Sequence, residues 1–223
     1  MLLVVFDVDG TLVDSQAHIV AAMQAAFAEG GQPVPDRATI LSIVGLSLPL
    51  AIETLTPGAD PATQGRMVAA YRDAFVALRT ELGEGASPLY PGALDTLAAL
   101  GARDDVLLGI ATGKSQRGLD LLLDHYDLRR RFVTAQSADG HPSKPHPAML
   151  ETALAEAGVA PAQAVMLGDT TYDMIMAANA GVAGIGVAWG YHPAEALTEA
   201  GAETVLGGFE GLLPHLTETG RLA

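Results

Sequence analysis

The amino-acid sequence predicts an α/β fold: a doubly wound, Rossmann-like parallel sheet with helices on both faces and an inserted α-helical domain. Along most of the chain, short apolar runs alternate with segments of helical periodicity. Such alternation predicts parallel strands joined by right-handed helical crossovers. Between residues 15 and 88 the alternation stops, and helical patterns follow one another.

The predicted strands are continuous apolar runs, as expected for strands buried on both faces of a sheet. The first is LLVVFD at residues 2–7, which ends at an Asp-Gly pair. The others lie at 106–112, 131–135, 164–169 and 183–189. Helices are predicted after them at 115–125, 146–158, 171–181 and 209–217.

The inserted domain is predicted from a region without a convincing strand. Stretches with Gly and Pro separate its helical patterns, which lie at 16–29, 37–44, 47–55 and 61–82. Hinges are expected near 13–16 and 84–90. The predicted domains are therefore an α/β core, residues 1–14 and 89–223, and an inserted helical domain, residues 15–88.

Composition and charge exclude several classes of function. The chain has 223 residues and a net charge of −14, so its field would repel nucleic acid and anionic membranes. It has no cysteine, which excludes disulfides and thiolate chemistry. Neither a membrane span of roughly 18 apolar residues nor a secretory signal is evident. We expect a cytoplasmic protein without nucleic-acid or membrane partners, and the sequence leaves its oligomeric state open.

Lysine usage singles out two positions. Lys114 and Lys144 are the only lysines, against ten arginines. Such a lysine is expected to act as a compact ammonium group, which a planar guanidinium does not replace. Chance retention is the alternative for both residues.

Polar residues follow the predicted strands at the edge where a parallel sheet binds ligands. Asp7 and Asp9 follow the first strand, Thr112 ends the second and Asp169 ends the fourth. Lys144 lies just before a predicted helix. The carboxyl ends of parallel strands form one crevice, so these side chains are expected to converge there.

Four motifs resemble those of the haloacid dehalogenase-like hydrolases, in the same order and across nearly the whole chain. They are DVDGTLVDS at 7–15, ATGK at 111–114, SKPHP at 143–147 and GDTTYD at 168–173. A DxD pair alone is common by chance, whereas the ordered set is specific. The segments YPGAL and ATGKSQRGL look closest to the phosphoglycolate phosphatase-like subgroup with a small helical cap. The resemblance implies hydrolysis of a small phosphorylated metabolite.

The resemblance also implies roles for the converging residues. Asp7 would be the nucleophile and would form an aspartyl-phosphate. Asp9 would protonate the leaving oxygen and later deprotonate the attacking water. Thr112, the Gly113 amide and Lys144 would bind the phosphate, and Lys144 would also pair with Asp7.

Mg²⁺ is the cofactor that the resemblance implies, because a hard cation binds carboxylate and carbonyl oxygens and shields them from an incoming phosphate dianion. Its protein ligands would be Asp7, the backbone carbonyl of Asp9, and Asp169. Asp173 lies one helical turn after Asp169 and would hold waters at the metal or orient Lys144.

Simpler structural interpretations remain for these residues. Asp9, Asp169 and Thr112 could cap helices, and Asp173 could be a solvated helix residue.

Other polar residues are assigned mainly structural places. Lys114 and Ser115 are expected at the start of a helix, with substrate contact as the alternative. The stretch 189–192 could shape a pocket wall or only turn the chain. No acid or cysteine spacing makes a metal site for the histidines, so packing or surface positions are expected for His18, His141 and His146.

Other functions are weighed against phosphate hydrolysis. A β-phosphoglucomutase-like phosphomutase shares the catalytic residues but typically has Gly-Val where this chain has Gly10 and Thr11, which favours hydrolysis. The absence of a cap lysine disfavours the phosphonoacetaldehyde hydrolase type, and the second aspartate disfavours dehalogenation. A phospho-accepting receiver-like signalling domain is the non-enzyme alternative, but receivers are shorter and lack a helical insertion.

The helical insertion resembles a cap that closes over the active site and contacts the leaving group. Arginines in such a cap could meet a carboxylate such as that of glycolate. The candidates are Arg37, Arg66, Arg72 and Arg79. The sequence determines neither which of them face the site nor which ester is the substrate.

Overall fold

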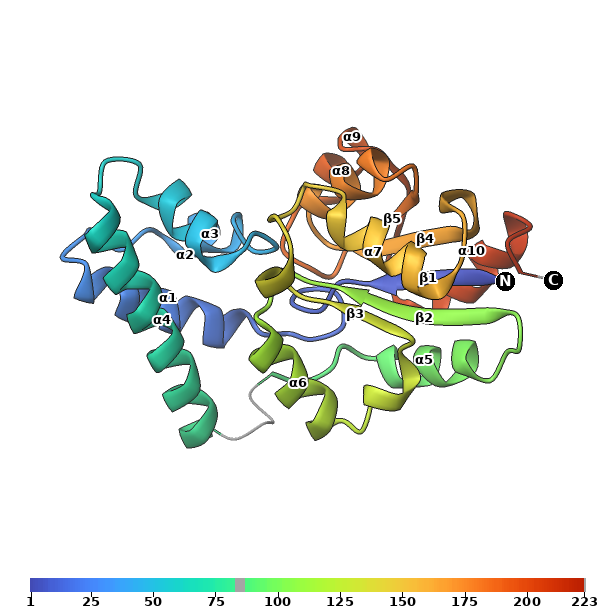
Figure 1. Cartoon of the computed structure of the whole chain (residues 1–223), viewed down its shortest axis with the longest axis horizontal. Helices are drawn as coiled ribbons and strands as arrows, with labels where there is room; N and C mark the ends of the chain where they lie inside the picture. Colours follow the sequence, from blue (N-terminus) through green and yellow to red (C-terminus); the bar gives the residue numbers. More distant parts are fainter. Residues whose placement is uncertain (83–86, 223) are drawn as a thin grey trace.

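The structure, a computed structural model, describes residues 1–82 and 87–222. Its centre is a sheet of six parallel strands in the order β3-β2-β1-β4-β5-β6, and a group of helices lies beside this sheet (Figure 1). The strands are β1 (Leu2–Phe6), β2 (Val106–Ala111), β3 (Thr134–Gln136), β4 (Ala164–Gly168), β5 (Ala183–Val187) and β6 (Ala202–Leu206). The predicted fold class is confirmed.

The central strand β1 shows why its sequence is apolar at every position. All five of its residues are buried. Val4 and Phe6 point into the core on one face of the sheet, and Leu3 and Val5 point into the core on the other face. A strand covered on both sides buries both sets of alternating side chains, so no polar alternation remains.

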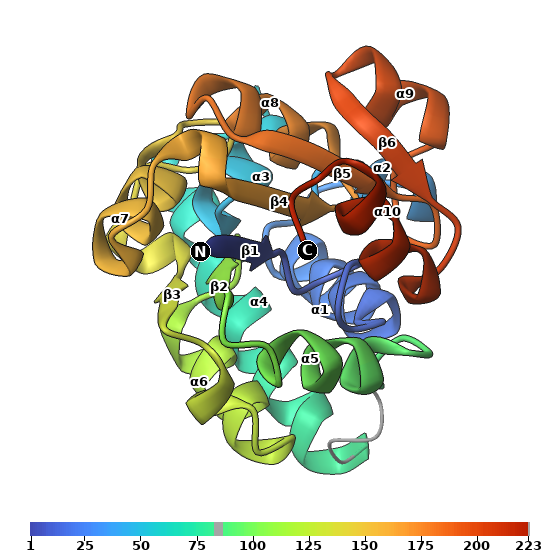
Figure 2. The same cartoon turned by 90° about the vertical axis from the view of Figure 1, so that its right-hand side faces the viewer.

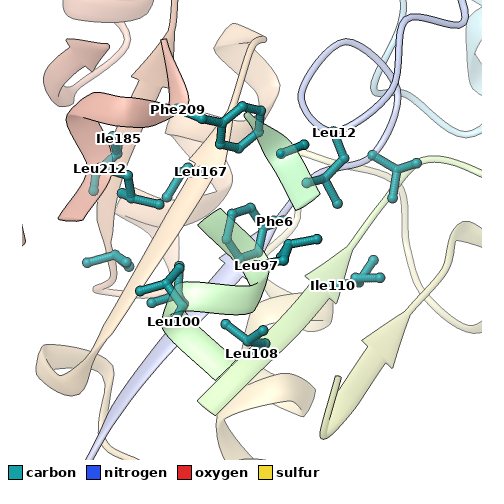
Figure 3. Close-up of a cluster of buried hydrophobic side chains, with 14 of the residues drawn as sticks. Phe6, Leu12, Leu97, Leu100, Leu108, Ile110, Leu167, Ile185, Phe209 and Leu212 are labelled. Atoms are coloured by element: carbon teal, nitrogen blue, oxygen red, sulfur yellow. The ribbon is translucent and has the colours of Figure 1, made fainter. Parts of the chain in front are cut away.

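Helices cover both faces of the sheet, which makes three layers (Figure 2). One face packs against α5 (Ala93–Gly101), α6 (Gln116–His125) and α10 (Leu212–Glu218). The other face packs against α7 (Ala148–Ala157) and α8 (Thr171–Asn179). Figure 3 shows the first of these cores, in which Phe6 lies among side chains from neighbouring strands and from α5.

Four helices form a separate unit beside the sheet: α1 (Gln16–Glu29), α2 (Arg37–Leu41), α3 (Leu48–Leu55) and α4 (Pro61–Leu82). Helix α1 packs along α4 (Figure 1). The unit has its own apolar core, which includes Met23, Phe27, Ile52 and Met67.

The chain leaves the sheet region and returns to it at neighbouring points. The Asp14 amide donates to the Pro88 carbonyl at 2.9 Å, and the Tyr90 amide donates to the Leu12 carbonyl at 2.9 Å. The four helices are therefore connected to the sheet region by two adjacent chain segments. Of the second expected hinge, residues 84–86 lie outside the described part of the chain.

The structure adds elements that the sequence patterns did not predict. Strand β6 lies at the edge of the sheet and is only partly buried, so its sequence AETVL lacks a continuous apolar run. The short helix α9 (Ala194–Glu199) packs against it. Within the described residues, no helix combines the length and the apolar character needed to cross a membrane.

Candidate active site

The motif residues meet at the carboxyl edge of the sheet, just beyond the ends of β1, β2 and β4. The Asp7 amide donates to the Leu167 carbonyl at 2.9 Å, so the pairing of β1 with β4 extends to Asp7. The Thr112 amide donates to the Gln136 carbonyl at 3.0 Å and extends the pairing of β2 with β3 in the same way. Because the sheet sets the positions of these residues, side chains far apart in sequence share one small volume.

A buried ion cluster forms the floor of the site. The Lys144 Nζ donates to Asp7 Oδ1 at 2.9 Å and to Asp173 Oδ1 at 2.6 Å, and the side chains of all three residues are at most 1% exposed. Burial alone would lower the pKa of Lys144, but the adjacent Asp173 and Asp7 carboxylates raise it above its ordinary value. Lys144 therefore stays charged in the interior.

Asp173 is held by the start of its own helix. Its Oδ2 accepts hydrogen bonds from the Thr170 amide at 3.1 Å and from the Thr170 hydroxyl at 2.7 Å. Both oxygens of Asp173 are thus engaged, one by a reciprocal helix cap and one by Lys144. Its geometry suits it to orient the lysine.

Asp169 is closely surrounded by two backbone segments, residues 10–11 and residues 190–191. Its Oδ1 accepts from the Thr11 hydroxyl at 2.9 Å, and its Oδ2 accepts from the Tyr191 amide at 2.9 Å. Glycines make this fit possible: a Cβ at Gly10 would come within 2.2 Å of Asp169 Oδ2, and a Cβ at Gly190 within 2.1 Å of the Asp169 Cβ. These contacts hold the Asp169 side chain in one rotamer.

The aspartates carry more negative charge than the single lysine balances. Carboxylate oxygens of Asp7, Asp169 and Asp173 lie within 4.8 Å of one another. Burial, against the opposing effect of Lys144, raises the pKa of Asp7 from 3.8 to about 6. Burial and the nearby Asp7 also raise the pKa of Asp169 well above its ordinary value. The Asp7 Oδ2 atom is buried without a hydrogen-bond partner.

These features fit a hard divalent cation. An unpartnered buried carboxylate oxygen, a second rigidly held carboxylate and an excess of negative charge make a donor set of the kind that Mg²⁺ accepts. The residues that would hold it are Asp7, Asp169 and the backbone carbonyl of Asp9.

Asp9 faces a second lysine. The Lys114 Nζ donates to Asp9 Oδ1 at 2.7 Å and to Asp9 Oδ2 at 2.9 Å, and it lies 5.1 Å from the centre of the Phe75 ring of α4. The side chains of Lys114 and Asp9 are 11% and 13% exposed. Lys114 therefore connects the sheet edge with the helical unit.

The helical unit closes over this edge of the sheet. The Ser47 amide donates to the Ser143 hydroxyl at 2.8 Å, and the Tyr172 hydroxyl donates to the Ser42 carbonyl at 3.2 Å. A Cβ at Gly113 would lie 2.5 Å from the Gly45 carbonyl oxygen, so only glycine permits this approach.

A cavity of about 860 Å³ lies between the two parts. Its polar end contains Asp7, Asp9, Thr112, Gly113 and Lys114. Its other walls come from the helical unit and, on the side of the sheet, from residues 115–121 and 138–139. The Asp7 carboxylate, the Asp9 carboxylate and the Lys114 ammonium group thus face one cavity. Such a site suits transfer of an anionic group to an aspartate.

Comparison with known proteins shows the family. Residues 4–187 match the family model described as haloacid dehalogenase-like hydrolase. The chain belongs to this family. The hydrolase is 36% identical over 210 residues to a protein named "Probable phosphatase IndB" from Dickeya dadantii, covering 93% of this chain and 90% of that protein.

Two further comparisons support the same family. A phosphoglycolate phosphatase from Yersinia pseudotuberculosis is 31% identical to the hydrolase over 214 residues, with 96% of this chain and 92% of that protein covered. The crystal structure of a hydrolase from Pseudomonas syringae superposes with a TM-score of 0.86 at 25% identity, covering 98% of this chain and 99% of that chain. The resemblance inferred from the four motifs is confirmed, and so is the assignment to an enzyme class.

The hydrolase keeps its predicted histidines away from the acid cluster. The His18 Nδ1 hydrogen-bonds the Ser87 hydroxyl at 2.7 Å, and the His141 Nε2 hydrogen-bonds the Gln136 side chain at 2.8 Å. The His146 Nδ1 accepts from the Ala148 amide at 3.2 Å on the surface.

Several contacts at the site were not evident from the sequence. Lys114 lies directly before the N-cap of α6, as expected, and its ammonium group also binds Asp9; its rarity in the chain was the available signal for this contact. The stretch 189–192 encloses Asp169, and its Trp189 indole donates to the Thr11 carbonyl at 3.0 Å. The close approach of Gly190 to Asp169 permits these contacts, and no sequence pattern marks that approach.

Proposed function

We propose that the hydrolase is a Mg²⁺-dependent phosphatase that cleaves a small phosphate monoester through an aspartyl-phosphate on Asp7. The observation that carries this proposal is the unpartnered Asp7 oxygen in a residue that lines the cavity, with Asp9 beside it. The relatives named phosphatase and phosphoglycolate phosphatase support it and make phosphoglycolate the first ester to test.

In the first half-reaction, an Asp7 carboxylate oxygen attacks phosphorus and the bond from phosphorus to the leaving oxygen breaks. The leaving oxygen takes a proton from Asp9 and departs as an alcohol. Lys144, paired with Asp7, keeps the nucleophile oriented and ionised. Thr112 and the Gly113 amide would hold phosphate oxygens at the polar end of the cavity.

In the second half-reaction, water gives a proton to Asp9 and attacks phosphorus. The bond between phosphorus and the Asp7 oxygen breaks, which releases inorganic phosphate and restores both aspartates. Asp7, Asp169 and the Asp9 carbonyl would hold Mg²⁺, which when bound would supply positive charge that offsets the charge of the phosphoryl group.

We also propose the domain division that suits this chemistry: an α/β core of residues 1–14 and 89–223, and a cap of residues 15–88. Apolar side chains of the helical unit form much of the cavity wall. A cap of this kind excludes water from the phosphoryl-enzyme and contacts the leaving group.

The decisive experiment assays purified protein against a panel of phosphate esters that includes phosphoglycolate, with Mg²⁺ or with EDTA. Phosphate release should require Mg²⁺. Asp7→Asn should abolish acid-stable labelling of the protein by a ³²P-ester, and Asp9→Asn should slow both half-reactions. Metal-independent turnover, or full activity of Asp7→Asn, would overturn the proposal.

A mutase control belongs in the same panel. Incubation with β-glucose 1-phosphate and a trace of its bisphosphate should give inorganic phosphate or no reaction. Formation of glucose 6-phosphate would instead assign the protein to the phosphomutases. The mainly apolar wall that the helical unit contributes speaks against that outcome, because a sugar phosphate needs polar recognition.

A further inference from the structure

We infer that the alcohol released from the substrate is uncharged and carries an apolar ring, and that the carboxylate of phosphoglycolate is a poor match for the cap. This inference rests on the proposed phosphatase function, since it concerns the ester that Asp7 would cleave. It follows from the walls of the cavity beyond the phosphate end.

The cap presents an apolar wall to the cavity, beyond its polar end. Its lining includes Ile19 and Met23 from α1, Val44 and Leu46 from the loop before α3, and Tyr71 and Phe75 from α4. A carboxylate placed against these side chains would lose water without gaining a hydrogen-bond partner. An apolar group in the same place would gain from leaving water.

Two neighbouring aromatic rings, those of Tyr71 and Phe75, form an aromatic surface in this wall. The Tyr71 and Phe75 rings are stacked, with centroids 5.9 Å apart and planes inclined by 23°. Phe75 also lies under the ammonium group of Lys114, which binds Asp9. The aromatic surface therefore begins beside the residue that would protonate the leaving oxygen, and a planar or cyclic leaving group can pack on it.

The described cations are poorly placed for a leaving-group carboxylate. Lys114 is already bound to both oxygens of Asp9. Arg72 and Arg117 line the cavity but are exposed, where water screens a charge pair.

The other cap arginines do not supply a buried guanidinium either. Arg37 donates to the Gln16 side chain, and Arg66 donates to the Thr63 hydroxyl at 3.0 Å, and neither lines the cavity. The side chain of Arg79 lies outside the described part of the structure. Among the described side chains, none offers the buried bidentate contact that selects a carboxylate.

The size of the cavity points the same way. About 860 Å³ falls in the range of roughly 300–1,000 Å³ that holds drug-sized ligands. A two-carbon acid esterified with phosphate would leave most of the apolar wall uncovered. A ring-bearing alcohol would cover it.

The test compares three esters whose leaving groups are alkyl alcohols: ethyl phosphate, 2-phenylethyl phosphate and phosphoglycolate. The first two differ only by the phenyl ring, so their ratio of kcat/KM isolates the contact with the cap. We expect 2-phenylethyl phosphate to exceed ethyl phosphate by about 10- to 100-fold, the factor that burial of one phenyl group supplies. It should exceed phosphoglycolate as well.

Variants connect this preference to the aromatic surface. Phe75→Ala should reduce the ratio between the phenylethyl and ethyl esters to a few-fold, and Phe75→Leu, which keeps apolar volume without a ring, should give an intermediate ratio. Val34→Ala is the matched control, because Val34 lies in the same helical unit but is 46% exposed and does not line the cavity. It should leave the ratio unchanged.

The outcomes separate the two proposals. Equal kcat/KM for the phenylethyl and ethyl esters, or a preference for phosphoglycolate, would overturn the inference while the phosphatase assignment stands. Absence of turnover with every ester would overturn the phosphatase assignment and the inference with it. A thermal melt of each variant shows whether a changed ratio arises in a folded protein.

Discussion

Lys114 is placed to balance negative charge at the polar end of the cavity, where Asp7 and Asp9 lie. Its ammonium group donates to both Asp9 oxygens and lies over the Phe75 ring. A phosphate dianion entering beside Asp7 and Asp9 would meet two carboxylates. The lysine offsets that repulsion and holds the proposed acid in one orientation.

Replacement of this lysine tests the role at the residue scale. Lys114→Met should lower kcat/KM by about 10- to 100-fold, because a positioned acid–base group contributes roughly 10²–10⁴-fold and would be held less well. Lys114→Arg should recover part of the loss by restoring the charge. The measurement is steady-state kinetics on the best ester of the panel.

Arg129→Met is the control for charge removal. Arg129 pairs with Asp120 and Asp124 at the surface, where its side chain is 50% exposed. It should leave kcat/KM unchanged. If Lys114→Met retained full activity, the pairing with Asp9 would be only a feature of the resting structure.

The two lysines show what the sequence can predict at the scale of a residue, because the partner of Lys144 was predicted and that of Lys114 was not. Lys144 was expected beside Asp7, and the two side chains are 2.9 Å apart; its role in binding phosphate stays a prediction. Lys114 follows Thr112 by two residues, so the sequence placed its backbone near the site. The direction of a long, flexible side chain depends on partners such as Phe75, which lies 39 residues earlier in the chain, and no local pattern reveals it.

At the scale of elements, the ends of β1 and β4 and the first turn of α8 bring like charges together. Folding forces the Asp7 carboxyl into this cluster, and its pKa rises from 3.8 to about 6. Between these pH values the folded state binds the proton more tightly than the unfolded state does. The contribution of Asp7 to stability therefore falls as the pH rises through this window.

Thermal melts without metal should show directly how much the ionised Asp7 destabilises the folded state. Asp7→Asn should melt at a higher temperature than the wild type near pH 7.5. The difference should shrink as the pH falls from about 6 towards 3.8, because Asp7 is protonated in both the folded and the unfolded state only below this window. For a chain of this size, each kcal/mol relieved corresponds to about 2–4 °C. The difference between the two proteins cancels the titration of carboxylates elsewhere.

Added Mg²⁺ should raise the melting temperature of the wild type at pH 7.5, because a ligand that binds only the folded state stabilises it. Asp7→Asn, which lacks one proposed ligand, should respond less. An equal response of both proteins would remove Asp7 from the ligand set.

The elements themselves were predictable where burial is complete. The runs that became β1, β2 and β4 are apolar throughout because helices cover both faces. The edge strand β6 has a half-exposed sequence, and helix α9 has six residues, too few for a periodic pattern. Both depend on tertiary contacts with β5, which a local sequence does not record.

At the scale of the whole molecule, the insertion should be removable. The Asp14 amide and the Pro88 carbonyl are hydrogen-bonded, so a short linker can span the gap, and the helical unit carries its own core. Replacement of residues 16–86 by Gly-Ser-Gly should leave a sheet domain that unfolds cooperatively. Circular dichroism melts and near-ultraviolet spectra test this expectation.

The shortened protein should bind Mg²⁺, because it retains the cluster of Asp7, Asp169 and Asp173. It should lose the preference for the phenylethyl ester, because the aromatic surface is removed with α4. A product without near-ultraviolet structure would show that the two parts fold as one unit. The sequence predicted an interruption of the strand–helix alternation. It could not predict how tightly the loop 42–47 would lie against the core, because a close approach such as that of Gly45 to Gly113 arises only in the folded chain.

The scarcity of lysine has a practical consequence. Lys144 is fully enclosed, and the Lys114 side chain keeps 11% of its surface open to solvent, so in the folded protein Lys114 is the lysine that an amine-directed reagent can reach. Mass spectrometry of an acylated sample would therefore report on the cavity beside Asp9 through one side-chain adduct. A bound ester or an inert phosphate mimic would protect that amine, which provides an occupancy assay for compounds that the enzyme does not turn over.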